Sequence, residues 1–215
     1  MFRDRSDAGN RLGEALAELR LTRPWVFALP RGGVPVAEQV ASKLGCPWSV
    51  ISVRKIGHPR QPELALGAVA RLRAPVFVRN DDVVRMYRIS ERQFEDLKAK
   101  ALIEVERRAE KYHVAPPPGL SGATAIVVDD GLATGATARA AIQALRHEKT
   151  LGVILAVPVA SQEAAAELRR DVDRLVALET PAVFPGVGAL YGHFEQLTDD
   201  VVLAALARSP SARSG

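Results

Sequence analysis

The segment from Ala125 to Thr137, AIVVDDGLATGAT, constrains the fold of this chain more than any other. It opens with a run of apolar and β-branched residues, which indicates a strand buried in the interior of a sheet. Asp129 and Asp130 follow this run at once, and a short loop of small residues then leads into a helix-forming sequence at 138–145. In an open α/β sheet, ligands bind at the carboxyl ends of the strands. The segment therefore predicts a strand, a ligand-binding turn and a helix.

The loop after the two aspartates has the composition of a phosphate-binding turn. Small residues let backbone N–H groups approach an anion, and the positive end of the next helix dipole favours negative charge. The residues expected to form this cradle are Gly131, Ala133, Thr134, Gly135, Ala136 and Thr137. The carboxylates of Asp129 and Asp130 could hold sugar hydroxyls or a hydrated Mg²⁺. The alternative is an ordinary turn in which the aspartates cap the helix, but it explains neither the paired acids nor the two threonines around one glycine.

This segment resembles the phosphoribosyl pyrophosphate (PRPP) signature of the type I phosphoribosyltransferases over about 13 positions. Members of that family carry a hydrophobic strand, two acids, a few small residues, then Thr-Gly and a further Thr or Ser. The resemblance implies an α/β fold with a Rossmann-like, mostly parallel sheet flanked by helices and a small C-terminal hood. It implies Mg²⁺-dependent use of PRPP, in which Asp129 and Asp130 orient the ribose and contact the metal directly or through water. The cradle would then bind the 5-phosphate.

A second strand-to-helix turn carries an anion-binding pattern, because the tandem glycines Gly32 and Gly33 let the backbone approach an anion and Arg31 adds a cation. In the family that the chain resembles, the turn after the first core strand binds pyrophosphate, often through a cis peptide. The resemblance implies this role for Arg31, Gly32 and Gly33, and also for Arg54 and Lys55, which close the predicted second strand. Arg31 and Lys55 are expected to act in catalysis together with the two aspartates.

The polar stretch 56–63 resembles the mobile catalytic loop of the same family. It is expected to contribute His58, Arg60 and Glu63, although ordinary surface charges on a solvated loop are the alternative. The residues leave open whether His58 acts as a general acid or only donates to a phosphate.

An irregular stretch at 183–194, rich in glycine and aromatic residues, lies where the family has the hood that covers the acceptor. Phe184, Tyr191 or Phe194 could stack on a planar ring there, and packing of the hood onto the core is the alternative.

The rest of the chain alternates strands and helices, as expected for a parallel α/β sheet. Strands are predicted at 25–29, 48–53, 64–72, 76–78, 151–157 and 174–178, and helices at 7–20, 35–44, 90–112, 161–170 and 199–208. The proline-rich segment 116–119 is predicted to be a rigid linker. We divide the chain into an α/β core with an N-terminal helix over 1–179, a hood and C-terminal helix over 180–208, and a disordered tail over 209–215.

Composition narrows the functional classes. A net charge of +4 and a pI near 9.5 suit an anionic small substrate. The sequence contains no basic tract interleaved with aromatic residues, so it does not indicate nucleic-acid binding. The single cysteine, Cys46, excludes a disulfide framework and a cysteine-rich metal site. No apolar run is long enough for a membrane span, and the charged N-terminus lacks a signal core, so a cytoplasmic protein is expected, in which a homodimer is compatible with the sequence.

Three functions stay open at this level. The first is transfer of the 5-phosphoribosyl group of PRPP to a nitrogenous acceptor, with release of pyrophosphate. The second is a PRPP-binding regulator with little or no catalysis. The third is a phosphoester hydrolase using the Asp pair with Mg²⁺, which would need further acids nearby. Purine-salvage members usually have a third acid at the position of Ala133, so the acceptor is undetermined.

Overall fold

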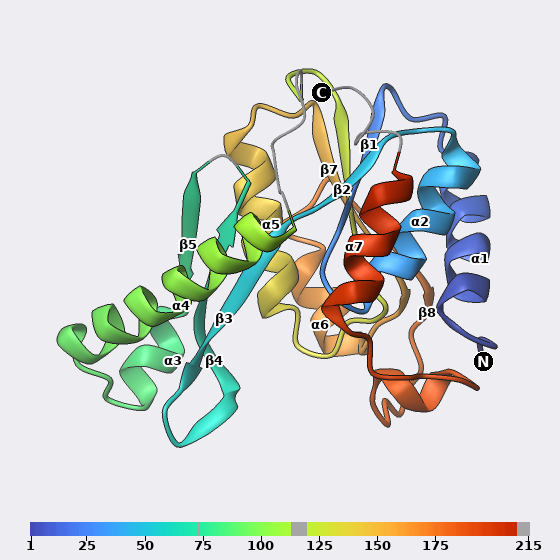
Figure 1. Ribbon diagram of the computed structural model, residues 1–215. Coiled ribbons are helices and arrows are strands. Elements are labelled where there is room, and N and C mark those ends of the chain that lie inside the picture. Colours follow the sequence, from blue (N-terminus) through green and yellow to red (C-terminus); the bar gives the residue numbers. More distant parts are fainter. Residues whose placement is uncertain (73, 113–119, 210–215) are drawn as a thin grey trace.

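The structure is a computed structural model that describes residues 1–72, 74–112 and 120–209 (Figure 1). The predicted proline-rich linker and the tail from residue 210 lie outside the described residues. Ser209, the first residue of the predicted tail, is buried, and its Oγ donates a hydrogen bond to the backbone oxygen of Trp48 at 2.8 Å. The ordered C-terminal region therefore extends at least one residue beyond its predicted end.

A five-stranded sheet forms the centre of the fold, in the order β2-β1-β6-β7-β8, and every neighbouring pair is parallel. Its strands are β1 (Pro24–Ala28), β2 (Trp48–Val50), β6 (Thr124–Val128), β7 (Gly152–Val159) and β8 (Arg174–Glu179). Every residue of β6 is buried, as its apolar sequence predicts. From β1 the chain proceeds to β2 on one side, and from β6 to β7 and β8 on the other. The strand order therefore reverses between β1 and β6, which makes a topological switch point.

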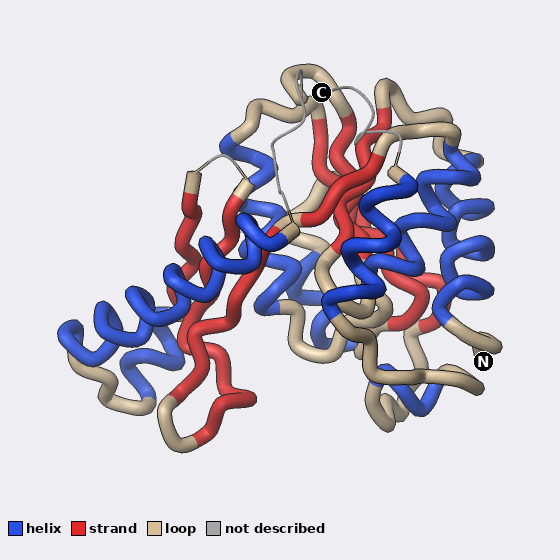
Figure 2. Tube along the Cα trace, in the orientation of Figure 1, coloured by secondary structure: helices blue, strands red, loops and turns tan. Residues whose placement is uncertain are grey.

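Helices cover both faces of this sheet (Figure 2). They are α1 (Arg5–Ala17), α2 (Gly33–Leu44) and α7 (Asp199–Arg208) on one face, and α5 (Ala136–His147) and α6 (Gln162–Leu168) on the other. Alternate side chains of β6 pack on opposite faces of the sheet: Ile126 belongs to the hydrophobic cluster with α2, and Val127 to the cluster with α5. The expected Rossmann-like, mostly parallel sheet flanked by helices is thus confirmed.

A second, antiparallel sheet was not predicted as such. It is built from β3 (Ser52–His58), β4 (Gln61–Arg71) and β5 (Pro75–Arg79). Two helices, α3 (Asp81–Met86) and α4 (Glu91–Lys111), follow β5 in the chain and pack against this sheet. The single strand predicted at 48–53 is wrong, because the chain leaves the parallel sheet at Ile51 and enters the second sheet. Most of the loop predicted at 56–63 is a hairpin between β3 and β4, with register shifts near its tip.

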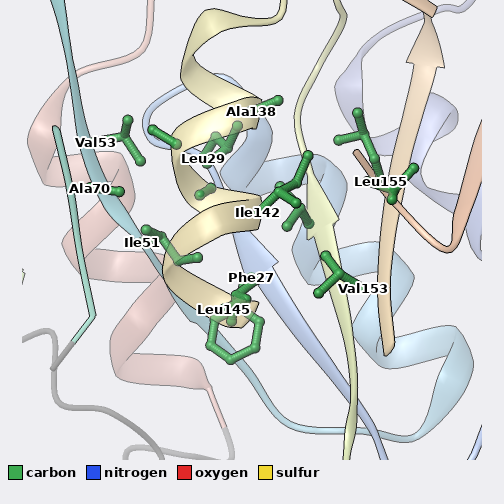
Figure 3. Close-up of a cluster of buried hydrophobic side chains, with 14 of the residues drawn as sticks. Phe27, Leu29, Ile51, Val53, Ala70, Ala138, Ile142, Leu145, Val153 and Leu155 are labelled. Carbon is green, nitrogen blue, oxygen red and sulfur yellow. The ribbon is translucent and has the colours of Figure 1, made fainter. Parts of the chain in front are cut away.

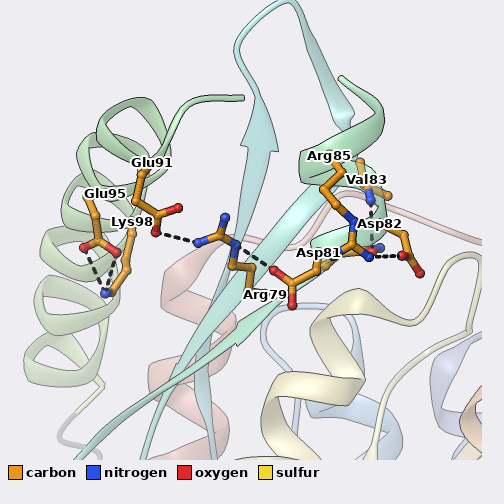
Figure 4. A network of polar contacts seen from close by, with 9 residues as sticks. Arg79, Asp81, Asp82, Val83, Arg85, Glu91, Glu95 and Lys98 are labelled. Carbon is orange, nitrogen blue, oxygen red and sulfur yellow. Dashed lines mark hydrogen bonds and ion pairs between the residues drawn. The ribbon is translucent and has the colours of Figure 1, made fainter. Parts of the chain in front are cut away.

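Packing holds the second sheet between two helices. Ile56, Leu66 and Val69 are buried beneath α4, whereas Val53 and Ala70 join the core beneath α5. At the end of β5, Arg79 pairs with Glu91 of α4 at 2.6 Å and with Asp81 of α3 at 2.9 Å (Figure 4). Because Val53 and Ala70 belong to the same core cluster as the buried residues of α5, the second sheet is continuous with the main core.

The helix α5 packs between the two sheets. Its Ile142 and Leu145 point toward Phe27 of β1 and Val153 of β7 (Figure 3).

Among the described residues, no helix is both long enough and apolar enough to cross a membrane.

We predict that Ile142→Ala lowers the free energy of unfolding by about 2–5 kcal/mol, because it leaves a cavity in the core beneath α5. Leu151→Ala serves as the control, since Leu151 is 65% exposed whereas Ile142 is fully buried. The control should change stability by less than about 0.5 kcal/mol. Urea unfolding followed by circular dichroism measures both, and equal losses would contradict this description of the core.

Candidate functional site

Two strand-to-helix turns meet at the switch point of the parallel sheet. The amide of Leu29, just after β1, donates to the backbone oxygen of Val128 at the end of β6, at 2.9 Å. A Cβ added to Gly33 would lie 2.6 Å from that same oxygen, and one added to Gly32 would collide with the carboxylate of Asp130. Only glycine at these two positions allows the Arg31 turn to lie against the acids after β6. The peptide between Pro30 and Arg31 is cis, as the family resemblance implies.

Asp129 and Asp130 are partly buried at the end of β6. Oδ1 of Asp129 accepts the amide of Asp130 at 2.9 Å, and Oδ2 of Asp130 accepts Nε of Arg5 at 2.8 Å. Burial raises the pKa of Asp129 well above its usual value, and the neighbouring charge of Asp130 raises it further. Burial also raises the pKa of Asp130, against the opposing effect of Arg5. Arg5 belongs to no recognisable motif, so sequence reasoning missed it.

The loop that follows the aspartates is fixed by its neighbours. The amide of Leu132 donates to Val159 at 2.8 Å, and Leu132 accepts the amide of Ser161 at 2.9 Å. The Ser161 hydroxyl donates to the backbone oxygen of Ala133 at 3.0 Å. Gly135 has a φ of +74°, which suits glycine, and caps the start of α5. The loop thereby presents the first turn of α5, where N–H groups lack intrahelical partners, and its role as a phosphate cradle stays a prediction.

The hood segment closes over the start of this loop. A Cβ on Gly131 would lie 2.5 Å from a methyl group of Val187, which belongs to the 3-10 helix η1 (Val187–Leu190). The Tyr191 hydroxyl donates to the backbone oxygen of Asp130 at 2.6 Å. Burial raises the pKa of this phenol, so it stays protonated and keeps donating. The hood is therefore bonded to the same residue that carries the second acid.

An open cleft of about 340 Å³ lies beside Asp130. Its lining residues are Arg5, Arg31, Gly32, Asp130, Phe194, Glu195, Gln196 and Leu197. Phe184 and Tyr191 do not line it, because they pack with Phe2 in a separate apolar cluster. Of the three aromatic candidates in the hood, the structure thus brings only Phe194 to the cleft.

The basic residues predicted to bind pyrophosphate are split between two places. Arg31 lines the cleft, with its guanidinium 3.9 Å from Asp199. Lys55 pairs with Ala68 across β3 and β4 and so lies on the face of the second sheet that packs against α5. Arg54 lies on the opposite face, which α4 covers.

The hairpin tip carries the remaining predicted residues. The backbone amide of Arg60 donates to Nδ1 of His58 at 3.2 Å, and the His58 ring lies 5.3 Å from that of Tyr87. Neither residue lines the cleft, and the side chain of Glu63 lies outside the described part of the chain.

A second cavity, of about 370 Å³, lies between the second sheet and α5. It touches the predicted phosphate loop at Ala136 and is also lined by Arg79, Arg85 and Arg139. Arg139 is paired with Asp171, which does not line this cavity, at 2.7 Å. We assign the candidate site to the cleft beside Asp130, because of these two cavities it is the one that combines a paired acid with the Arg31 turn.

The donors present fit a magnesium ion that a substrate helps to hold. Within residues 1–72, 74–112 and 120–209, no group of three His, Cys, Asp or Glu side chains could bind a metal by itself. Mg²⁺ commonly binds through one or two carboxylates together with substrate phosphates and water. Asp129 and Asp130 can supply that share.

We predict that Asp129→Asn raises the free energy of unfolding at pH 7 by roughly 1 kcal/mol. A raised pKa in the folded state means that stability is greatest below the unfolded pKa and declines as pH rises through the folded pKa. Asn cannot ionise but can still accept the Asp130 amide, so the decline above about pH 4 should flatten. Denaturant unfolding across pH measures this.

Asp171→Asn is the control for that experiment, because Asp171 accepts a hydrogen bond from Arg139 at 2.7 Å and its loss should not stabilise the fold. A loss of stability at every pH in Asp129→Asn would contradict the burial argument.

Comparisons with known proteins show which family the chain belongs to. The phosphoribosyl transferase domain family matches residues 6–191. Two curated relatives from Mycobacterium tuberculosis, "Putative phosphoribosyl transferase MT0597" (strain CDC 1551 / Oshkosh) and "Putative phosphoribosyl transferase Rv0571c" (strain H37Rv), are each 45% identical over 210 residues, or 97% of this chain. The chain spans about half the length of these relatives, 47% of each.

A solved structure extends the comparison to three dimensions. The crystal structure of TT1426 from Thermus thermophilus is 42% identical, with a TM-score of 0.82, and the match covers 96% of this chain and 97% of that one. The family resemblance of the Asp-Asp segment is thus confirmed across most of the sequence, and the chain belongs to the phosphoribosyl transferase domain family.

Proposed function

We propose that this chain transfers the 5-phosphoribosyl group of PRPP to a nitrogenous acceptor and releases pyrophosphate, with Mg²⁺ as cofactor. The observation that carries the proposal is the contact between Gly32 and Asp130. This contact places the predicted pyrophosphate turn directly against the predicted ribose acid, and the phosphate loop continues from the same acid. The order of these three features, turn, acid and loop, matches the order of the pyrophosphate, the ribose and the 5-phosphate in PRPP.

The reaction replaces one bond at the anomeric carbon of the ribose. The bond to the pyrophosphate oxygen breaks, the acceptor nitrogen bonds to the same carbon, and a proton leaves the acceptor. Positive charge develops on the sugar and negative charge on the leaving group. Asp129 and Asp130 would hold the ribose hydroxyls and offset the positive charge, while Arg31 would stabilise the departing pyrophosphate.

The roles proposed for the other groups follow from where they lie relative to the two aspartates. The amides of the Arg31 turn would bind pyrophosphate, and the loop from Thr134 to Thr137 would bind the 5-phosphate. When bound, Mg²⁺ neutralises negative charge on the pyrophosphate. Lys55 faces α5 and is a candidate to reach the leaving group if the second sheet moves toward the loop. For Arg54, whose face is covered by α4, the structure offers less support.

The acceptor site is proposed to be the cleft beside Asp130, with Phe194 rather than Phe184 or Tyr191 as the ring that borders it. A PRPP-binding regulator with little turnover is the second candidate, because it would need the same site. Pyrophosphate release separates the two, since a regulator would bind PRPP without releasing pyrophosphate in the presence of any acceptor.

We predict that Gly32→Ala weakens binding of PRPP in the presence of Mg²⁺ by at least about 10-fold, because its Cβ would displace the Asp130 carboxylate. The double variant Asp129→Asn with Asp130→Asn should lose affinity to a similar or greater extent. Gly13→Ala is the matched control, because its Cβ would crowd Lys43 at 2.8 Å between α1 and α2, outside the cleft. Titration calorimetry measures all three, and parent-like affinity in Gly32→Ala and in the double variant would contradict the site.

The acceptor prediction rests on Ala133, which replaces the acid that purine-salvage members present to the base. Adenine, hypoxanthine and guanine should each give a kcat/KM below about 10⁴ M⁻¹s⁻¹, the low end of ordinary enzyme efficiency. Ala133→Asp should raise the rate with at least one of them. Steady-state pyrophosphate release measures both, and a higher value for any purine with the parent protein would show that Ala133 does not exclude these bases.

A further inference from the structure

The N-terminal segment is bonded to the hood. The amide of Phe2 donates to Leu190 at 3.0 Å, and Phe2 in turn accepts the amide of Gly192 at 2.8 Å. The Phe2 and Tyr191 rings lie 5.5 Å apart. The N-terminus and the hood therefore lie side by side, at the lower right of Figure 1. This arrangement brings the start of α1 to the cleft.

Arg5, the first residue of α1, connects three parts of the site. Its Nε donates to Oδ2 of Asp130 at 2.8 Å, and its Nη1 donates to the backbone oxygen of Glu195 at 2.9 Å. Its guanidinium carbon lies 3.8 Å from the centre of the Phe194 ring. The side chains of Arg5 and Asp130 are only 10% and 14% exposed. One planar cation is thus shared between the second acid and two residues of the hood.

We infer that Arg5 is a positioning residue, which aims the Asp130 carboxylate at the ribose of PRPP and couples that carboxylate to the hood. The inference rests on the proposed function. Arg5 fixes one carboxylate oxygen and Gly32 borders the same carboxylate, so the orientation of Asp130 is set before a ligand binds. The Tyr191 hydroxyl holds the Asp130 backbone from the hood side. Glu195 and Phe194 tie the hood to Arg5, so an ordered hood and an aimed carboxylate depend on the same side chain.

A lysine could not replace this arginine. Its single ammonium can neutralise Asp130, but it lacks the planar fork that bonds two acceptors while stacking on a ring. Charge and geometry are therefore separable by substitution. Arg5→Met removes both, whereas Arg5→Lys keeps only the charge.

The test compares two ligands on the parent protein and three single variants, and then repeats the Arg5→Met comparison in an Asp130→Asn background. Titration calorimetry with PRPP and with pyrophosphate, each in the presence of Mg²⁺, is run on the parent, Arg5→Met, Arg5→Lys and Arg11→Met. Arg11 is the matched control, since it lies on the same helix, stacks on the Phe2 ring at 4.5 Å and pairs with Glu179 at 3.9 Å, without contacting Asp130. Thermal unfolding of each variant shows that it is folded.

Arg5→Met should weaken PRPP binding by about 10-fold or more, while pyrophosphate affinity changes by less than about twofold, because pyrophosphate makes no ribose contacts. Arg5→Lys should unfold near the parent temperature yet recover only part of the PRPP affinity. Arg11→Met should match the parent with both ligands. In an Asp130→Asn background, Arg5→Met should cause no further loss.

Four results would overturn the inference. Parent-like PRPP affinity in Arg5→Met would refute it while leaving the proposed function in place. Equal loss of PRPP and pyrophosphate affinity, or an undiminished effect in the Asp130→Asn background, would show that Arg5 only supports the fold. A parent protein that binds no PRPP would refute the proposed function together with this inference.

Discussion

The central constraint on this structure is the placement of two adjacent carboxylates at the end of a fully buried strand. An ionised carboxylate that loses water needs hydrogen bonds and opposite charge in return. Asp129 obtains a backbone amide, and Asp130 obtains Arg5. Removing one partner of a buried ion pair costs about 3–5 kcal/mol, because the other charge is left uncompensated. The N-terminal segment, the hood and the Arg31 turn all converge on this pair.

This convergence explains why distant parts of the chain are needed for one site. The switch point between β1 and β6 brings two strand-to-helix turns together, and the glycines at 32 and 33 allow them to touch. Helix α5 starts at the end of the loop that follows Asp130 and also packs against both sheets. A ligand that binds at the start of α5 is therefore next to the element that joins the parallel sheet to the second sheet.

The sequence was sufficient for the elements whose signal is local. The run before Asp129 has the continuous apolar character of a buried parallel strand, and the small residues after Asp130 mark a turn into a helix. The split at Ile51 was not predictable in the same way, because β-forming residues continue through it with no glycine or proline to mark a change of sheet. The hairpin after it is polar because its tip is exposed, and it also holds Pro59 and Pro62, so the sequence indicated a loop.

The parts of the site that were missed depend on contacts between residues far apart in sequence. Arg5 meets Asp130 across 125 positions, and nothing near Arg5 distinguishes it from the other charged residues of the N-terminus. Ser161 caps α6 and also bonds the Ala133 carbonyl, a role that only the neighbouring strand ends reveal. Sequence motifs identified the loop at 131–137 and the Arg31 turn as candidates, whereas tertiary structure was needed to show that both lie against one carboxylate.

Hydrogen exchange on the full chain, with and without PRPP and Mg²⁺, tests the central claim most directly, because it reports on the backbone amides of both turns in the unaltered protein. We predict slower exchange at 31–34 and 130–137 when the ligand is present, and unchanged exchange at the far end of α5. Protection confined to 65–85, around the cavity beneath the second sheet, would contradict this placement of the ligand, as would no protection at either turn.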